Sequence, residues 1–572
     1  MFAQCPPPVL TSLFPASPSS FRQNGFAVGL HFITPDEVIV ISGDNFHGQS
    51  PLTFAGAAFI TRGVRVGPDQ FQWTQETLLR ASSAAAFDQA GGAVAIAGLP
   101  EGGVLALSGA ALDDAPLADA GSVAVFKRGI GGTWEQEATL LAPAPGAGDT
   151  FGSALATDGV RAAIAAPLDD TSAGANAGSV AVFARTAPGL WTLDGALTPP
   201  EPQAGETLGD SVAISGEWAL AGAPGRDTAA GANAGAALLF RRAGDAPAAW
   251  QHVATLVAPD AAAADAFGAS VALDESGAIA VVGAPAAGPG ESGAAYAFTR
   301  SGEGPAAVWT FAQTLQLPPG DAAPGDQFGF SVAVAQGVIV VGAIKDDAPA
   351  PNTGSASVFD RDDAAPGAPW TLRSTVTRTQ LANDDFGWSV ATSRGLVIVG
   401  APANDDFGLN WGNTLALPAP IAPVIIEAPD DQTLPARGPL ALRVRAEGPG
   451  PLAYQWLRDG VPLLDTADIA GTTTPDLSLS AIAAGASGVY SARITGPCGE
   501  RTVDAPIVVL APECPGDATG DLQVSFADVT AVLANFGAAR FPATGPGDAD
   551  ASGRVDFADI TAALAAFGSA CR

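Results

Sequence analysis

The first 418 residues repeat a pattern of short apolar segments with a period near 60 residues. Each repeat has two runs of small and β-branched residues joined by a glycine-containing turn, such as SVAVAQGVIVVGA at 331–343. A third run follows, such as GSASVF at 354–359, and a fourth begins at a tryptophan. Short runs of this kind, bounded by turn residues, are typical of strands. The pattern predicts four short antiparallel strands in each repeat.

Two series of large residues set the period. Four strands cannot bury both faces of their own sheet, whereas repetition around an axis lets each sheet cover its neighbour. The sequence is therefore interpreted as a mainly β protein that begins with a seven-bladed β-propeller, in which both series pack between blades. The tryptophan series is Trp73, Trp134, Trp191, Trp250, Trp309 and Trp370, and the second series is Phe26, Phe87, Phe151, Leu208, Phe267, Phe328 and Phe386.

The repeats resemble FG-GAP repeats, which form the blades of the integrin α-subunit propeller and of many secreted bacterial proteins. The resemblance rests on segments such as FGASVALDESGAIAVVGAP at 267–285 and FGFSVAVAQGVIVVGA at 328–343. The seventh repeat lacks its tryptophan-bearing strand. The segment before Phe26 is similar to the one before Phe151, so residues near Val9–Phe14 are expected to complete the seventh blade and close the ring.

Integrin-type blades often carry a DxDxDG calcium loop, and this chain has none. Pairs of aspartates recur instead in the turn before the third strand of several repeats. We interpret them as solvated turn residues, with metal ligation as the alternative. These pairs are Asp113–Asp114, Asp169–Asp170, Asp346–Asp347 and Asp405–Asp406.

The period ends near residue 418, and residues 419–511 read as short alternating strands. This segment resembles a bacterial immunoglobulin-like domain, which implies a β-sandwich. Trp456 stands where the core tryptophan of such domains lies, and Tyr490 matches their tyrosine corner. Val444 and Ala492 occupy the places of the two bridged cysteines, so the sheets must be held by apolar packing. A spacer and a ligand-binding module are both open readings, and the spacer is favoured.

The last 61 residues, 512–572, contain two copies of an acidic loop followed by a short apolar helix. A twelve-residue calcium loop takes oxygen ligands at positions 1, 3, 5, 9 and 12 and a backbone carbonyl at position 7. Gly553 provides the glycine of position 6, whereas Leu522 replaces it in the first copy, so the first site should bind calcium more weakly. The ligands are Asp517, Thr519, Asp521, Gln523 (carbonyl), Ser525 and Asp528 in the first loop, and Asp548, Asp550, Ser552, Arg554 (carbonyl), Asp556 and Asp559 in the second.

Two loop–helix units about 30 residues apart resemble a type I dockerin, a small α-helical calcium-loop domain. The resemblance implies two Ca²⁺ ions and a calcium-dependent partner of the cohesin type. Positions 10 and 11 of each loop help to select that partner, and here they are Phe526–Ala527 and Phe557–Ala558. The helices should pack through apolar stripes, which are Val529, Val532, Leu533 and Phe536 in one and Ile560, Leu564 and Phe567 in the other.

Composition narrows the choice of partners and compartment. With 26 basic and 58 acidic residues, the net charge of −32 disfavours nucleic acid as a partner. No uncharged apolar run reaches membrane-spanning length. The four cysteines, Cys5, Cys498, Cys514 and Cys571, lack zinc-site spacing; Cys514 and Cys571 bracket the two acidic loops, and we expect them to pair in an oxidising compartment. The first residues lack a signal peptide, although FAQC resembles the residue of a cleavage junction.

The sequence thus divides into a propeller (1–418), an immunoglobulin-like sandwich (419–511) and a dockerin-like domain (512–572). The favoured function is a secreted or cell-surface, non-catalytic binding or adhesion protein. Its propeller would present loops to a polysaccharide or cell-surface ligand, and its tail would tether it to an extracellular protein. One alternative is a polysaccharide-degrading or other propeller enzyme carried by a dockerin, although His31, His47 and His252 are scattered and no catalytic motif stands out. The other makes the tail a surface-sorting tag.

Overall fold

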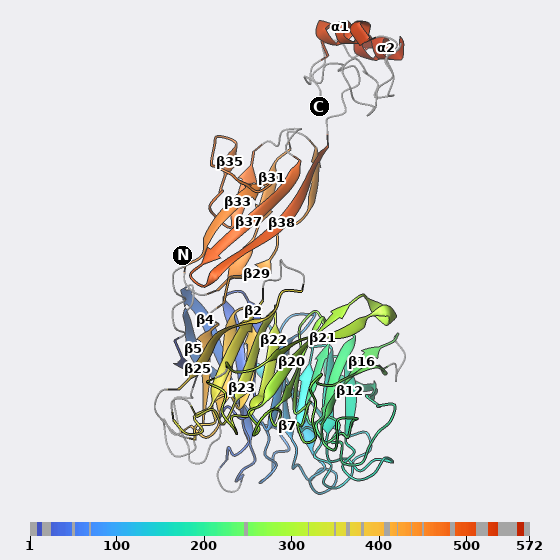
Figure 1. Cartoon of the computed structure of the whole chain (residues 1–572), viewed down its shortest axis with the longest axis vertical. Helices are drawn as coiled ribbons and strands as arrows, with labels where there is room; N and C mark the ends of the chain where they lie inside the picture. The colour runs from blue at the N-terminus through green and yellow to red at the C-terminus, as the bar shows by residue number, and fades with distance from the viewer. Residues whose placement is uncertain are drawn as a thin grey trace. The chain divides into compact units, whose positions relative to one another are not determined.

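The chain forms two compact units, which are described separately. One consists of residues 1–424, 447–452 and 496–499, and the other of residues 425–446, 453–495 and 500–572. The fold is mainly β, with two short α-helices near the C-terminus (Figure 1). The computed structural model describes residues 9–13, 24–48, 52–67, 70–244, 250–318, 320–347, 350–361, 367–378, 383–404, 412–419, 421–435, 438–448, 451–480, 487–510, 524–535 and 557–565.

Within its described residues, the first unit contains seven four-stranded antiparallel sheets. Six of them follow chain order, and the seventh takes its outer strand from the N-terminal segment. The sheets are β2 (Val28–Thr34), β3 (Glu37–Asp44), β4 (Ala57–Gly67) and β5 (Gln70–Leu79); β6 (Ala93–Gly98), β7 (Val104–Ala110), β8 (Ser122–Arg128) and β9 (Trp134–Leu141); β10 (Ala154–Thr157), β11 (Arg161–Ala166), β12 (Ser179–Ala187) and β13 (Leu190–Ala196); β14 (Val212–Ser215), β15 (Trp218–Ala223), β16 (Ala236–Arg242) and β17 (Trp250–Leu256); β18 (Ser270–Leu273), β19 (Ile279–Ala284), β20 (Ala294–Ser301) and β21 (Val308–Leu315); β22 (Phe328–Ala335), β23 (Val338–Ala343), β24 (Ser355–Asp360) and β25 (Thr371–Thr377); and β26 (Ser389–Ser393), β27 (Leu396–Ala401), β28 (Asn413–Pro418) and β1 (Thr11–Ser12). A short 3-10 helix, η1 (Gly304–Ala306), precedes β21.

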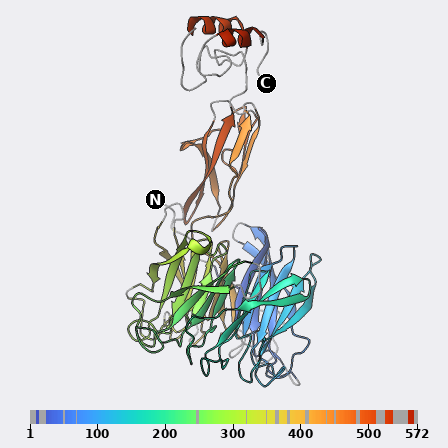
Figure 2. The same cartoon turned by 90° about the vertical axis from the view of Figure 1, so that its right-hand side faces the viewer.

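The seven sheets follow one another around a closed ring. Figure 2 shows strands of this unit from the side. The first strand of each sheet contacts the first strand of the next, and β26 contacts β2 to complete the circle. The pairing of β1 with β28 joins Thr11 to Ala416 and Ser12 to Leu415. These repeated four-stranded sheets fit a β-propeller, and the prediction of four antiparallel strands per repeat is confirmed.

The apolar core lies between neighbouring sheets, so each sheet covers the next. One cluster, for example, combines Leu239 of β16 with Val282 of β19 around the buried Phe267. The next combines Val281 of β19 with Ile339 of β23 around the buried Phe328. Small and β-branched residues fill these strands because the sheets approach closely at their inner edges.

A glycine with φ between 87° and 98° stands shortly before the first strand of six sheets and at the start of β22 in the other. Its N–H donates to the second strand of the same sheet, as from Gly268 to the carbonyl of Gly283 (2.9 Å). An L-residue rarely adopts this φ, which explains why the repeat keeps glycine there. The seven are Gly25, Gly91, Gly152, Gly209, Gly268, Gly329 and Gly387.

The predicted series of large residues was wrong in its first two members. The residue before the repeated glycine is Asn24 in the first sheet and Ala90 in the second, so Phe26 and Phe87 are not the equivalents of Phe151. Asn24 forms an isolated β-bridge with Gly412, and Ala90 forms one with Gly56. Phe267 forms the same β-bridge with Gly235. Phe87 is exposed. The phenylalanine was a misleading marker because the positive-φ glycine, rather than the aromatic ring, fixes the register.

The second unit includes a pair of facing sheets. Trp456 is buried and its indole N–H donates to the carbonyl of Thr474 (2.9 Å). Tyr490, Val444 and Ala492 are also buried, so apolar packing fills the space between the sheets. One sheet runs β30 (Gln432–Pro435), β38 (Gly499–Leu510), β37 (Gly488–Gly496), β33 (Ala453–Arg458) and β34 (Val461–Pro462); the other runs β31 (Leu440–Arg443), β36 (Asp476–Leu479) and β35 (Ile469–Ala470); β29 (Val424–Glu427) pairs with β32 (Arg445–Glu447).

The two helices, α1 (Phe526–Asn535) and α2 (Phe557–Ala565), pack against each other. Val532 and Ala563 are fully buried at their contact, and Val529 and Ile560 lie beside them. The predicted stripe was wrong at Leu533 and its counterpart Leu564, which are 60% and 59% exposed. Ala531 also packs at this contact, so the helices meet through smaller side chains than the predicted stripe. Phe536 and Phe567 lie outside the described residues.

Candidate functional site

Most of the predicted calcium ligands lie outside the described residues. These are Asp517, Thr519, Asp521, Gln523, Asp548, Asp550, Ser552, Arg554 and Asp556. Asp528 lies in α1 and Asp559 in α2, but their side chains are also outside the description. Ser525 precedes α1, and its hydroxyl accepts the N–H of Ala527 (3.1 Å), which caps the start of the helix.

The predicted partner-binding positions lie at the starts of the two helices. Phe526 is 75% exposed, and Ala527 and Ala558 are exposed too. Phe557 begins α2, and its side chain is outside the description. An exposed phenylalanine at a helix start is compatible with contact to another protein.

Cys498 takes part in a disulfide. Its partner is outside the described residues, as are Cys5, Cys514 and Cys571. The expected pairing of Cys514 with Cys571 stays a prediction.

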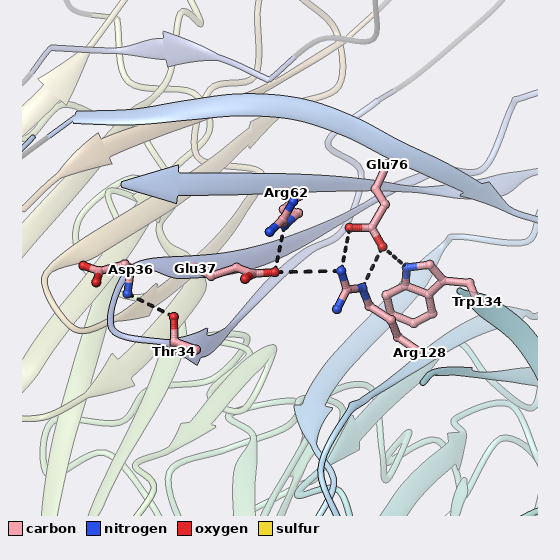
Figure 3. A network of polar contacts seen from close by, with 7 residues as sticks. All are labelled: Thr34, Asp36, Glu37, Arg62, Glu76, Arg128 and Trp134. Atoms are coloured by element: carbon pink, nitrogen blue, oxygen red, sulfur yellow. Dashed lines mark hydrogen bonds and ion pairs between the residues drawn. The ribbon is translucent and has the colours of Figure 1, made fainter. Parts of the chain in front are cut away.

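Between neighbouring sheets of the first unit, an arginine and a tryptophan hold a carboxylate of the preceding sheet. Figure 3 shows the first example, in which Glu76 of β5 accepts hydrogen bonds from Arg128 Nε (2.7 Å) and from the indole of Trp134 (2.7 Å). Glu37, which is bound to Arg62 (2.7 Å), lies 3.8 Å from Arg128 Nη2, which also donates to Glu76 (3.2 Å). We call the arginine and tryptophan together the Arg–Trp clamp.

The Arg–Trp clamp recurs in the next two sheets. Glu137 binds Arg185 (2.7 Å) and the indole of Trp191 (3.3 Å). Burial alone would raise the pKa of Glu137, but the hydrogen bonds and charge of Arg185 hold it below its usual value. In the third example, Asp194 binds Arg242 (2.8 Å) and the indole of Trp250 (3.2 Å). The clamp was missed in the sequence, where the acid and its tryptophan are separated by 54 to 58 residues.

The clamp changes in the following sheets because the acid is absent. Glu76, Glu137 and Asp194 each stand three residues after the tryptophan of their own strand. The same spacing after Trp250 and Trp309 gives Val253 and Ala312. The clamp that faces Ala312 consists of Arg361 and Trp370. A cavity of about 250 Å³ lies there, lined by Ala278, Thr299, Arg300, Ala312, Gln313, Arg361, Gly367, Ala368, Pro369 and Trp370. We call it the clamp pocket.

The polar groups of the clamp pocket are held in place by the surrounding structure. The Arg361 guanidinium stacks on the ring of Trp370, 4.3 Å from its centre. The Trp370 indole donates to the carbonyl of Gly337 (2.9 Å), and Gln313 bonds to both backbone groups of Trp370. Arg300 donates to Gly277 and Gly302 (2.9 Å each). The pocket therefore has two arginines beside the small, apolar Ala312, and one of them, Arg300, also forms an ion pair with Glu303 (3.1 Å).

A second repeated feature is a buried acid three residues before the positive-φ glycine. It accepts a backbone N–H of its own loop, as Asp326 does from Ala323 (2.6 Å) and Asp265 does from Ala262 (2.6 Å). The register of the repeat could have been read from this acid. The members are Asp88, Asp149, Glu206, Asp265, Asp326 and Asp384.

The aspartate pairs interpreted as solvated turn residues divide into two roles. Asp114, Asp170 and Asp347 are exposed and each accepts a backbone N–H within its loop. Their predecessors Asp113 and Asp346 are buried, so the interpretation was wrong for them. Each buried member lies near the acid that precedes the first strand of its sheet. The pair Asp405–Asp406 lies outside the described residues.

The described residues contain no group of three or more histidine, cysteine or acidic side chains placed to hold a metal ion. None of their helices is long and apolar enough to cross a membrane. The three histidines lie at separate places: His31 in β2, His252 in β17, and His47 after β3, where it is 3.6 Å from Asp44.

Five segments of the chain match the family described as FG-GAP repeat: 134–183, 191–240, 250–298, 309–359 and 380–414. The chain contains FG-GAP repeats. Each matched segment begins at or close to the outer strand of one sheet and ends in or near the third strand of the next. The FG-GAP segments include the clamp tryptophans Trp134, Trp191 and Trp250 and the acids Glu137 and Asp194, whereas the clamp arginines Arg128, Arg185 and Arg242 lie outside them.

Solved structures give short matches. A titin M10–obscurin-like 1 Ig complex is 23% identical over 16% of this chain and 95% of that chain, with a TM-score of 0.15. The titin M4 trigonal form is 22% identical over 16% and 97%, with a TM-score of 0.15. The Ig-like domain of human leucine-rich repeat-containing protein 4 is 23% identical over 15% and 86%, with a TM-score of 0.14. No match was found among curated proteins.

Proposed function

We propose that this is a secreted, non-catalytic binding or adhesion protein. Its FG-GAP repeats form a seven-bladed propeller that presents a ligand site, and residues 419–511 form an immunoglobulin-like spacer. The dockerin-like tail binds two Ca²⁺ ions and tethers the protein to a cohesin-type or other extracellular partner. The observation that carries the ligand-binding part is the clamp pocket, a cavity of about 250 Å³ lined by Arg300, Arg361 and Trp370.

The occupants of the other clamps indicate the ligand chemistry. Glu76, Glu137 and Asp194 each place a carboxylate against an arginine, and such charge-assisted bonds are among the stronger polar contacts. Ala312 stands at the position of these acids in the clamp pocket, and we propose that a carboxylate of the ligand binds there, beside Arg300 and Arg361. A polyanion would be repelled by the net charge of −32. We propose as the ligand a glycan that carries an isolated carboxylate, such as a terminal uronic acid.

Binding of an oligosaccharide with a terminal glucuronic acid should depend on the clamp pocket. Ala312→Glu gives this pocket the internal carboxylate that Glu137 gives its own clamp, so we expect it to weaken binding by roughly tenfold or more. Arg361→Gln should weaken it to a similar extent. The measurement is isothermal titration calorimetry with the full chain, against the same oligosaccharide ending in glucose.

Val308→Glu is the matched control, because it adds the same charge on the same strand at an exposed position. It should leave binding unchanged. Equal affinity for the acidic and neutral oligosaccharides, or unchanged binding by Ala312→Glu, would rule out this ligand.

The tail is proposed to act as a calcium-dependent tether. The sequence of the second loop has acidic oxygens at four ligand positions, Asp548, Asp550, Asp556 and Asp559, and it keeps Gly553 at the turn. The exposed Phe526, Leu533 and Leu564 support a protein-binding face on the helix pair, since exposed apolar groups gathered on one element often mark interfaces.

Removal of one ligand from each loop should separate the two sites. We expect Asp548→Ala to abolish the tighter calcium-binding event of the tail, and Asp517→Ala to abolish a weaker one, because Thr519 and Leu522 already weaken the first loop. Calcium titration of the full-length variants by calorimetry measures both events. If both variants bind calcium like the unaltered chain, the loops are not calcium sites and the tether loses its basis.

A further inference from the structure

The buried acid before each first strand is faced by a residue that follows the second strand of the same sheet. In one sheet this residue is Arg226, whose guanidinium forms an ion pair with Glu206. In another it is Asn404, whose amide nitrogen donates to Asp384 (3.1 Å). Arg226 and Asn404 each stand 20 positions after the acid that they contact. These two sheets thus supply a cation or an N–H donor at this place.

The sheet formed by β22–β25 supplies a second acid instead. Twenty positions after Asp326 stands Asp346, and both are buried, with 1% and 4% of their surface exposed. The N–H of Lys345 donates to the carbonyl of Asp326 (3.2 Å), which sets the neighbouring Asp346 beside Asp326. Two carboxylates therefore meet here, whereas the sheets that contain Glu206 and Asp384 pair the acid with a cation or an amide. Asp88 and Asp149 also lie near a second acid of their own sheets, but each of their oxygens is outside the set that is buried without a partner.

One oxygen of Asp326 lacks any partner among the residues that the structure describes. Its Oδ2 accepts the N–H of Ala323 (2.6 Å), whereas Oδ1 is fully buried and accepts no hydrogen bond. Burial, followed by the charges of Asp346 and Asp347, raises the pKa of Asp326. A buried and unsatisfied carboxylate oxygen beside a second acid is costly unless a positive charge lies between them.

We propose that a calcium ion binds between Asp326 and Asp346, in the place that the Arg226 guanidinium takes in its own sheet. Two carboxylates balance a divalent charge, and hard oxygen ligands suit calcium, whose coordination sphere backbone carbonyls and water can complete. Calcium fits these two irregular loops better than magnesium, which requires near-ideal octahedral geometry. The site is at the opposite end of the sheet from the Gln336–Gly337 turn between β22 and β23.

This calcium site is independent of the tail loops and of the clamp pocket, so it is tested locally in the full chain. Hydrogen exchange is followed in peptides covering 321–330 and 343–356, with and without millimolar calcium. Because a ligand that binds only the closed form slows opening of the loops that hold it, exchange in these peptides should slow by roughly tenfold with calcium.

Asp346→Asn gives this sheet the acid–amide pair that Asp384 and Asn404 form in theirs. In this variant the two peptides should be protected without calcium and should not respond to it. Asp326→Asn should also abolish the response. The control is Asp227→Asn, which removes one exposed carboxylate that accepts the N–H of Asn233 (2.9 Å) in the Arg226 loop. It should leave the calcium response intact.

If the two peptides of the unaltered protein exchange at the same rate with and without calcium, the proposal is wrong. Asp326 and Asp346 would then share a proton instead of a calcium ion. A calcium response that persists in both Asp326→Asn and Asp346→Asn would place the ion elsewhere and overturn it as well. Equal protection by magnesium at the same concentration would overturn the choice of calcium. Loss of the response in these two variants alone supports the site.

Discussion

Replacing Arg226 by alanine should destabilise the unit of repeated sheets by about 3–5 kcal/mol. The Arg226 guanidinium is paired with Glu206, a residue with no exposed surface, and it also donates to the carbonyl of Glu201 (2.8 Å). Its removal leaves a buried carboxylate without a counter-charge. The loss of the pair's attraction is therefore accompanied by the full cost of burying an unpaired charge.

The free energy of unfolding can be measured by urea denaturation followed by tryptophan fluorescence. Trp456 is the only one of the ten tryptophans outside the repeats, so the signal reports mainly on the first unit. The double variant Glu206→Gln/Arg226→Met removes both charges and should recover much of the lost stability, since apolar or neutral replacements of buried pairs are often tolerated. A cost below about 1 kcal/mol for Arg226→Ala would show that water enters the site and that the pair is not truly buried.

The repeated strands could be predicted from the sequence because their pattern is local. Runs such as SVAVAQGVIVVGA carry their own turn, and Gln336 and Gly337 both have the positive φ that a two-residue hairpin turn requires. The closed succession of sheets followed from the same repetition. What failed was the register of the first two repeats, where the aromatic residue was followed instead of the glycine.

The candidate sites were less accessible to sequence reasoning because they depend on contacts between distant positions. The carboxylate of Glu76 and the indole of Trp134 come from successive repeats, and their contact exists only once two sheets are packed together. The burial of Asp346 was likewise hidden, because an Asp-Asp pair in a turn usually faces solvent. In contrast, the tail ligands could be proposed from spacing alone, since a calcium loop is a contiguous twelve-residue segment.

The repeated glycines show how narrowly the inner part of the first unit is constrained. At Gly268, φ is +98°, and an added Cβ would lie 2.4 Å from the carbonyl oxygen of Ala236 and 3.1 Å from the amide of Ala223. Both neighbours are backbone atoms of adjacent strands, so neither can rotate away. Other inner glycines meet backbone in the same way, as Gly283 does at the carbonyl of Gly329 (1.9 Å).

Gly268→Ala should therefore destabilise the first unit by about 2–5 kcal/mol, the sum of backbone strain at positive φ and of steric overlap with fixed strands. Gly148→Ala is the matched control, because Gly148 has a similar φ of +83° but no atom within 4 Å of its added Cβ. The control should show the strain alone, about 1–2 kcal/mol. Both values come from the same urea unfolding measurement. Equal losses in the two variants would mean that the sheets can move apart at Gly268, and that close approach of the backbones does not set the spacing of neighbouring sheets.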